Sequence, residues 1–258
     1  MECRGSSPPT SMGLSPRWRK RFGGLSSLVR SNHRLFKLAM HLANPRLCST
    51  SATISTAYRP RVSPHKLVDF AIFVSPEADK TRPAASETIK AICKQRATLS
   101  INHTDYPPFR SEPIVVSVET KRPDGDINNA TLQLGTWHAA QFRNISAVRL
   151  LASSLDALNV RNNTSRRVKG DTSGIEFLPG ILIHGHVWYF VASTPPREPA
   201  ARSTGCLYTK IQIGTTEKPL GVYSIVVALQ RIKEWVETKY WPAFCDDVLG
   251  LDLDSSEG

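Results

Sequence analysis

Acidic side chains are nearly absent from the first quarter of this 258-residue sequence. Residues 1–66 contain twelve Lys or Arg but only one acid, Glu2, whereas residues 67–258 contain 21 side chains of each sign. The net charge of +11 therefore comes entirely from the N-terminal segment. Because the rest of the chain is neutral overall, the basic composition does not indicate that a folded domain binds nucleic acid.

Long apolar runs and paired cysteines are also missing. No apolar run reaches the ~18 residues of a bilayer-spanning helix, and the first residues lack the apolar core of a secretory signal. The five cysteines are scattered and form no Cys-x-x-Cys pair. This usage suits free thiols in a reducing compartment and argues against a disulfide framework or a zinc ribbon. We therefore expect an intracellular protein of the nucleus or cytoplasm that has no membrane partner.

The basic segment has three competing interpretations. Its arginines, serines and one amphipathic stretch, residues 27–42, are typical of a transit peptide, which would indicate mitochondria. Residues 17–21 are instead typical of a nuclear-import or nucleic-acid-contacting patch. The third interpretation is a disordered leader without a role, and we favour it. We therefore predict a leader at residues 1–57, a folded domain at residues 58–246 and an acidic, frayed tail at residues 247–258.

One apolar segment ends in a carboxylate and an amine. Val115, Val116 and Val118 predict a buried β-strand that runs directly into Glu119 and Lys121. Residues i and i+2 of a strand point to one face, so the two charged side chains lie side by side. A carboxylate that holds a divalent cation, beside an amine that acts on the attacking water, suits a metal-dependent phosphodiesterase. A solvated ion pair of little energetic value is the competing interpretation.

A second carboxylate, Asp69, is expected inside an earlier strand. A carboxylate among apolar neighbours costs several kcal/mol unless it is paired or binds a metal. Asp69 could cap the strand or pair with Lys66, but we favour a metal role because Glu119 supplies a second carboxylate. The strand is predicted from the apolar residues Leu67, Val68, Phe70, Ile72 and Val74.

A long helix is predicted directly after the Glu-x-Lys strand, from Asp126 to about Leu158. Asp126 or Asn128 is a suitable N-cap. Gln133 and Trp137 are one turn apart and share a face of this helix. A glutamine in its first turns can point back at the strand end, although an exposed helical glutamine is the simpler alternative.

These residues, taken in order, resemble the PD-(D/E)XK nuclease superfamily. The resemblance is carried by Asp69, by Glu119 and Lys121 at a strand end, and by Gln133 and Trp137 on the next helix. The last two are similar to the Gln-x-x-x-Tyr element of the λ-exonuclease-like branch. More narrowly, the chain resembles the fungal PD-(D/E)XK nuclease-like domain proteins from about Tyr58 to Asp246. The matching blocks are residues 66–70, 100–108, 116–122, 132–137, 177–180, 186–191 and 220–223.

The resemblance implies a restriction-endonuclease-like core, in which helices flank a central mixed sheet. It implies that Asp69 and Glu119 hold one or two Mg²⁺ (or Mn²⁺) ions and that the Thr120 backbone carbonyl completes the metal shell. Lys121 would orient the water and stabilise charge developing on the phosphate, and Gln133 would fix the water or Lys121. The implied substrate is nucleic acid, with DNA favoured over RNA.

The sequence departs from the family pattern in three places, the first of which is a long insertion between Asp69 and Glu119. Val68 stands where the family often has proline, a change that the superfamily tolerates. The family also often places a further acid on an upstream helix, yet no Asp or Glu occurs between Cys3 and Val68. This absence supports the alternative of a catalytically inactive, nuclease-like scaffold that binds nucleic acid or protein. A ligand-binding protein of another fold remains if the four polar side chains do not converge.

The remaining pattern predicts an α/β or α+β sandwich around a mixed sheet. Gly185 marks a turn between two strands, so His184 and His186 beside it are expected as turn residues rather than as a metal pair. The other predicted elements are a helix at residues 84–95, a strand–turn–strand unit at 181–192, a strand at 206–213 and a helix at 219–240.

Overall fold

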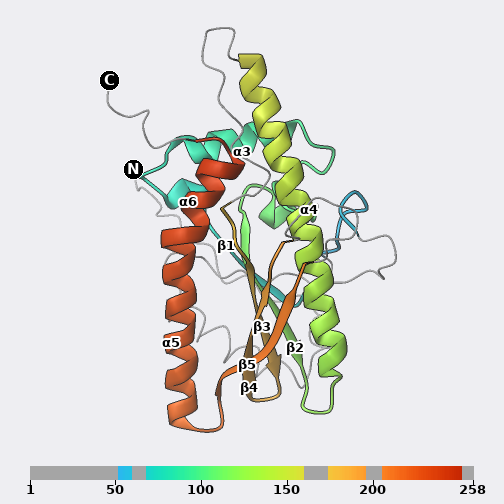
Figure 1. Cartoon of the computed structure of the whole chain (residues 1–258), viewed down its shortest axis with the longest axis vertical. Coiled ribbons are helices and arrows are strands. Elements are labelled where there is room, and N and C mark those ends of the chain that lie inside the picture. The colour runs from blue at the N-terminus through green and yellow to red at the C-terminus, as the bar shows by residue number, and fades with distance from the viewer. Residues whose placement is uncertain (1–51, 60–67, 160–173, 196–204, 252–258) are drawn as a thin grey trace, which may run out of the picture.

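The computed structural model describes residues 52–59, 68–159, 174–195 and 205–251. Within these ranges, five strands form one sheet in the order β1-β2-β3-β4-β5, and the sheet lies between the two longest helices in Figure 1. The strands are β1 (Phe70–Phe73), β2 (Ile114–Lys121), β3 (Leu178–His184), β4 (Val187–Ser193) and β5 (Leu207–Thr215). The longer helices are α3 (Ala84–Lys94), α4 (Ile127–Asn159) and α5 (Pro219–Trp235). The predicted sheet of mixed direction with flanking helices is confirmed.

The connections explain why the sheet is mixed. Strand β2 is antiparallel to β1 but parallel to β3, and the other neighbouring strands are antiparallel. A parallel pair needs a long crossover, which α4 provides over 33 residues. Strands β3 and β4 form the predicted hairpin, where Gly185 has a φ of 59° that favours glycine. The sheet therefore has the Glu-x-Lys strand, β2, inside it rather than at an edge.

Helices α4 and α5 lie on opposite sides of the sheet (Figure 1). On the α4 side, Leu134 and Trp137 of the helix belong to one buried cluster with Leu182 of β3. On the α5 side, Ile225 and Leu229 belong to another cluster with strand residues such as Val118 and Ile181. Because both faces are covered, the central strands are apolar almost throughout. A charged side chain on β2 must therefore be buried or lie at the strand end.

Asp126 fixes the start of α4. Its Oδ1 atom accepts hydrogen bonds from the backbone N–H groups of Asn128 at 2.9 Å and Asn129 at 3.1 Å. These bonds make Asp126, rather than Asn128, the capping residue. The cap sets where the helix begins and so how far Gln133 stands from the end of β2.

The packed structure extends beyond both limits expected for the domain. Before residue 58, Ala52 and Ile54 are 1% and 2% exposed, and Ile54 forms an isolated bridge with Thr104. After residue 246, Val248 and Leu249 are 1% and 2% exposed, so the tail is not frayed there. Residues 1–51 and 252–258 lie outside the described part of the chain.

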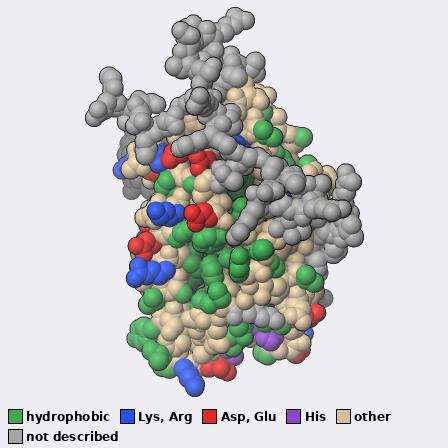
Figure 2. All heavy atoms as spheres, viewed as in Figure 1, with side chains coloured by type: hydrophobic (Ala, Val, Ile, Leu, Met, Phe, Trp, Pro, Cys, Tyr) green, Lys and Arg blue, Asp and Glu red, His purple; other side chains and the backbone are tan. Residues whose placement is uncertain are grey.

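Helix α5 continues without a break into η3 (Val236–Tyr240), α6 (Trp241–Ala243) and η4 (Phe244–Val248). Its buried stripe includes Ile225, Leu229 and Ile232, while its outer face exposes Leu220, Tyr223 and Val227. Figure 2 shows hydrophobic side chains at the lower left, where α5 begins in Figure 1. Among the described helices, none combines the length and the apolar character needed to cross a membrane.

Candidate active site

Asp69 connects β1 to the end of β2. It stands immediately before β1, and its backbone N–H donates to the Val118 carbonyl at 3.1 Å. Its carboxylate oxygen Oδ2 accepts hydrogen bonds from the Thr120 backbone N–H at 2.7 Å and from the Thr120 hydroxyl at 2.6 Å. Asp69 therefore forms hydrogen bonds with Val118 and Thr120, the residues before and after Glu119 in β2. Lys66, the alternative partner expected for Asp69, lies outside the described residues.

Glu119 is a buried carboxylate, not a solvated one. Its side chain is 2% exposed, while that of Lys121 is 24% exposed, and Lys121 Nζ lies 2.5 Å from Glu119 Oε1. Glu119 pairs across the sheet with Leu182, which packs in the cluster beneath α4. Cross-strand partners share a face, so Glu119 points toward the α4 side. The interpretation as a solvated surface ion pair is therefore wrong.

The surroundings of Glu119 disfavour its charge. Burial raises its pKa, the neighbouring Asp69 charge raises it further, and the Lys121 ammonium only partly opposes both, leaving a pKa of about 8. The effect of Asp69 places the two carboxylates within electrostatic reach of each other. A pair of acids in one partly buried site stores repulsion that a bound cation would relieve.

Two oxygen atoms of the motif residues have no hydrogen-bond partner. Glu119 Oε2 and Gln133 Oε1 are both buried and unpartnered. A buried acceptor left unsatisfied costs about 1–3 kcal/mol. Trp137, the other helical residue of the motif, is fully buried and meets His103 edge-on with ring centroids 4.3 Å apart. Trp137 is therefore a packing residue, whereas Gln133 carries a free acceptor on the same face of α4.

The oxygen atoms of these side chains suit a hard divalent cation. The carboxylates of Asp69 and Glu119 and the amide oxygen of Gln133 are oxygen ligands, which Mg²⁺ prefers, and Mg²⁺ usually binds one or two carboxylates and keeps several waters. Within the described ranges, no group of three or more His, Cys, Asp or Glu side chains is placed to hold a metal ion.

The Thr120 side chain has a role that the sequence did not reveal. Its backbone carbonyl was expected as a ligand, but its N–H and hydroxyl are what hold Asp69 in place. A threonine between Glu119 and Lys121 carries no signal for this contact in the sequence. The contact exists because β2 extends beyond the start of β1, which leaves the Thr120 N–H available to a side chain.

The two histidines beside the hairpin turn are engaged elsewhere. His184 Nε2 lies 3.1 Å from the Gly125 carbonyl, and His186 Nδ1 lies 2.9 Å from the Thr216 hydroxyl. His186 lies in the turn, whereas His184 is the last residue of β3. His184 instead joins the β3 end to the loop between Lys121 and α4.

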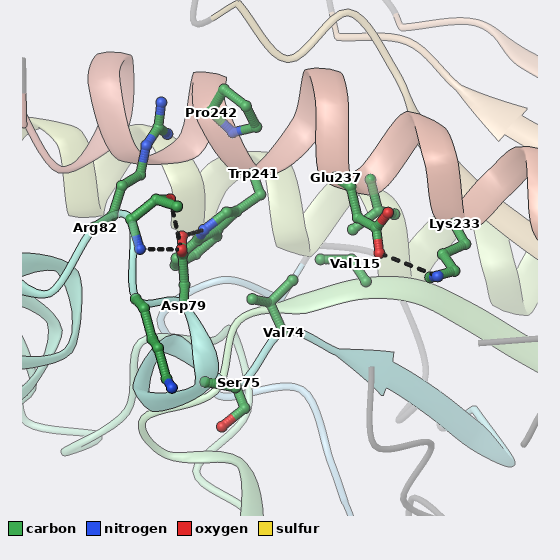
Figure 3. Close-up of a pocket in the computed structure, with 13 residues that line it drawn as sticks. Val74, Ser75, Asp79, Arg82, Val115, Lys233, Glu237, Trp241 and Pro242 are labelled. Atoms are coloured by element: carbon green, nitrogen blue, oxygen red, sulfur yellow. Dashed lines mark hydrogen bonds and ion pairs between the residues drawn. The ribbon is translucent and has the colours of Figure 1, made fainter. Parts of the chain in front are cut away.

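A separate pocket of about 550 Å³ opens at the other end of β2 (Figure 3). Val115, Val236 and Trp241 supply apolar walls. Asp79 on its rim accepts hydrogen bonds from Trp241 Nε1 at 2.6 Å and from the Thr81 hydroxyl at 2.6 Å. Lys233 and Glu237 form an ion pair across 3.5 Å. Its size is that of a small-molecule pocket, but these acids already have partners and lie apart from Asp69 and Glu119.

Comparison with known proteins supports the family suggested by the motif. The family model described as the PD-(D/E)XK nuclease superfamily matches residues 29–241. No curated protein and no solved structure gives a significant match. The match covers most of the 258 residues, and the mixed sheet between helices is the restriction-endonuclease-like fold expected from it. The chain therefore belongs to the PD-(D/E)XK nuclease superfamily.

Proposed function

We propose that this protein is a Mg²⁺-dependent nuclease that hydrolyses phosphodiester bonds of nucleic acid at the Asp69–Glu119–Lys121 cluster. The observation that carries the proposal is the buried Glu119 carboxylate, which touches Lys121 and has a free oxygen, Oε2, beside the Asp69 charge. A structural ion pair would not need a second acid whose charge opposes it. Burial and the Asp69 charge raise the pKa of Glu119, and a bound cation would relieve this cost.

Asp69 and Glu119 would hold the ion, with the Thr120 carbonyl and Gln133 Oε1 as further oxygen ligands from the motif. Bound there, a divalent ion supplies Lewis acidity at the phosphate and acidifies a water. The two hydrogen bonds from Thr120 to Asp69 Oδ2 fix that carboxylate, so only its other oxygen remains for a ligand. A ligand held this rigidly is already positioned before the substrate arrives.

Lys121 provides the positive charge at the solvent side of the cluster. It is the partly exposed member of the pair, whereas Glu119 beneath it is closed to solvent. A fixed ammonium at the edge of a buried site stabilises negative charge that develops on a phosphate in the transition state. It also orients a water that attacks from the solvent side. Lys121 therefore acts on the reaction, whereas the acids act on the cation.

The test compares Lys121→Ala with a matched lysine variant, Lys233→Ala. Lys233 also pairs with a glutamate and is 26% exposed, but it lies in the pocket at the far end of β2. Labelled single- and double-stranded DNA and RNA are incubated with Mg²⁺ or Mn²⁺, with and without EDTA. We expect the unmodified protein and Lys233→Ala to cleave, and Lys121→Ala to lose at least about 10²-fold in rate.

Cleavage that persists in EDTA, or that survives Lys121→Ala in a protein with unchanged melting temperature, contradicts the proposal. Metal binding without cleavage of any of the four substrates would instead favour the scaffold alternative. The scaffold alternative is tested because, among the described residues, no third His, Cys, Asp or Glu joins Asp69 and Glu119 as a possible metal ligand.

We further propose DNA over RNA as the substrate and the fungal nuclease-like domain proteins as the subgroup, both from the sequence motifs. The nucleus or cytoplasm is the proposed location, with mitochondria as the alternative if residues 1–57 act as a transit peptide. The same assay compares DNA with RNA directly, and fluorescence microscopy of a C-terminally tagged protein tests the location.

A further inference from the structure

A tight turn directly follows Lys121 and packs against the base of its side chain. The Gly125 N–H donates to the Arg122 carbonyl at 2.9 Å, which closes a β-turn whose second residue, Pro123, has a fixed φ. A Cβ atom built on Gly125 would lie 3.1 Å from the Lys121 Cβ atom, so the turn touches the first carbon of the lysine stem. The place of the turn therefore limits the conformations of this flexible four-carbon stem.

The turn between β3 and β4 holds this first turn in place. Lys121 pairs with His184 across the parallel strands β2 and β3, and the Gly185 N–H donates to the Lys121 carbonyl at 2.8 Å. Gly185 also approaches Pro123 so closely that a Cβ atom on it would lie 2.9 Å from Pro123 Cγ. Figure 1 shows both turns at the lower end of the sheet. The backbone of Lys121 is therefore fixed both by the turn that follows it and by the end of β3.

His184 adds a side-chain hydrogen bond to these backbone contacts. Its Nε2 atom lies 3.1 Å from the Gly125 carbonyl oxygen. A carbonyl oxygen only accepts, so Nε2 carries the proton and donates it, in the neutral ring and in the charged ring alike. The imidazole is half-buried and lies on the same face of the sheet as its cross-strand partner Lys121, and so as Glu119. It therefore reaches the turn from the side of the candidate active site.

We propose that His184 is a positioning residue for Lys121: through the Gly125 carbonyl it holds the Arg122–Gly125 turn against the lysine and so keeps the ammonium on Glu119. The contact that it maintains is the one of 2.5 Å between Lys121 Nζ and Glu119 Oε1. This inference rests on the proposed function, because Lys121 is the residue that acts there on the attacking water and on the phosphate. A misplacement of about 1 Å costs an enzyme about 10²-fold in rate, so His184 affects the rate of cleavage rather than the binding of substrate.

The first test measures the position of Lys121 without cleavage. In EDTA, the protein is acetylated with limiting acetic anhydride, and mass spectrometry gives the rate at Lys121 relative to that at Lys233. The two lysines are matched, because their side chains are 24% and 26% exposed and each pairs with a glutamate. His184→Phe keeps a ring but removes the donor, whereas His184→Gln keeps a side-chain N–H donor. We expect His184→Phe to raise the relative rate at Lys121 several-fold, because the amine leaves Glu119, and His184→Gln to restore it.

The second test is kinetic and uses a nucleic acid that the unmodified protein cleaves with Mg²⁺. His184→Phe should lower kcat by about 10–10²-fold with KM nearly unchanged. Combined with Lys121→Ala it should cause no further loss, because the two residues act as one unit. The control is His186→Phe in the adjacent turn, where the histidine contacts the Thr216 hydroxyl, and kcat should not change.

An unchanged acetylation rate of Lys121 in His184→Phe overturns the inference, and so does an equal rise at Lys233, which would indicate a general loosening of the fold. A rise that His184→Gln does not reverse also overturns it, because the N–H donor would then not be the cause. If His184→Phe slows Lys121→Ala further, His184 acts on the reaction by another route and the positioning role is wrong. The proposed function fails separately: if no nucleic acid is cleaved but the acetylation rates change as expected, the positioning of Lys121 stands and the nuclease chemistry does not.

Discussion

Glu119 is the residue on which sequence and structure contribute different information. Its position at a strand end, two residues before Lys121, indicated its chemistry from the sequence alone. Its burial did not follow from that pattern, because the solvated alternative has the same spacing. The cover comes from α4 and from Leu182 on the neighbouring strand, and both lie far away in the sequence.

The raised pKa of Glu119 predicts how the stability of the metal-free protein depends on pH. The folded-state value of about 8 lies above the ordinary value of 4.5. Folding therefore favours the protonated carboxyl, and this contribution is complete below about pH 4.5 and is lost as the pH rises through about 8. Urea unfolding in EDTA should show the free energy of unfolding falling by a few kcal/mol across this window.

Glu119→Gln separates this effect from other titrations. The variant cannot ionise, so the difference in stability between it and the unmodified protein should grow as the pH rises toward about 9. Glu234→Gln, an exposed residue of α5, is the control and should give a difference independent of pH. A constant difference for Glu119→Gln would contradict the burial of an ionisable carboxyl at this position.

At the scale of elements, the long helices and the buried strands were predictable and their irregularities were not. Apolar periodicity predicted α4 and the hairpin of β3 and β4, and the structure confirms both. The pairing of β1 with β2 contains a register shift between Ile72 and Phe73. That shift lets β2 present Val116 and Val118 to one cluster and Ile114 to the other. A bulge depends on both strands, so neither segment alone indicates it.

Two glycines allow α5 to pack directly on β5. A Cβ atom on Gly221 would overlap the Thr215 carbonyl oxygen, and one on Gly214 would overlap the Gly221 carbonyl oxygen. Gly221→Ala should therefore force the helix from the strand and lower the stability by about 1–3 kcal/mol, despite the better helix propensity of alanine. Ser224→Ala, an exposed position one turn further, should stay within about 0.5 kcal/mol of the unmodified protein. Chemical denaturation measures both variants.

At the scale of the whole molecule, the family match and the described structure give different N-terminal limits for the domain. The family match begins at residue 29, inside the basic segment predicted as a leader, whereas the described fold begins at Ala52. Composition argued for a leader because this segment lacks acids. Charge balance reports solubility and partners rather than packing, so it could not place the boundary.

Deleting residues 1–50 keeps Ala52 and Ile54 and is expected to leave the melting temperature nearly unchanged, because the deleted segment offers few apolar groups to bury. Deletion of residues 1–28, which removes only the chain before the family match, is the matched control. Differential scanning calorimetry compares the three proteins. If only the longer deletion lowers the melting temperature by many degrees, residues 29–50 are part of the fold and the predicted leader is too long.

The most direct test of the metal-dependent site is a calorimetric titration with Mg²⁺ near pH 8, on the unmodified protein, Glu119→Gln and Lys121→Ala. The unmodified protein should bind Mg²⁺ saturably and release protons, because the raised pKa leaves Glu119 partly protonated. Glu119→Gln should lose most of the affinity, whereas Lys121→Ala should retain it, since Lys121 is not a ligand. Binding that is absent from the unmodified protein, or equal in it and Glu119→Gln, would contradict the proposed metal-dependent site.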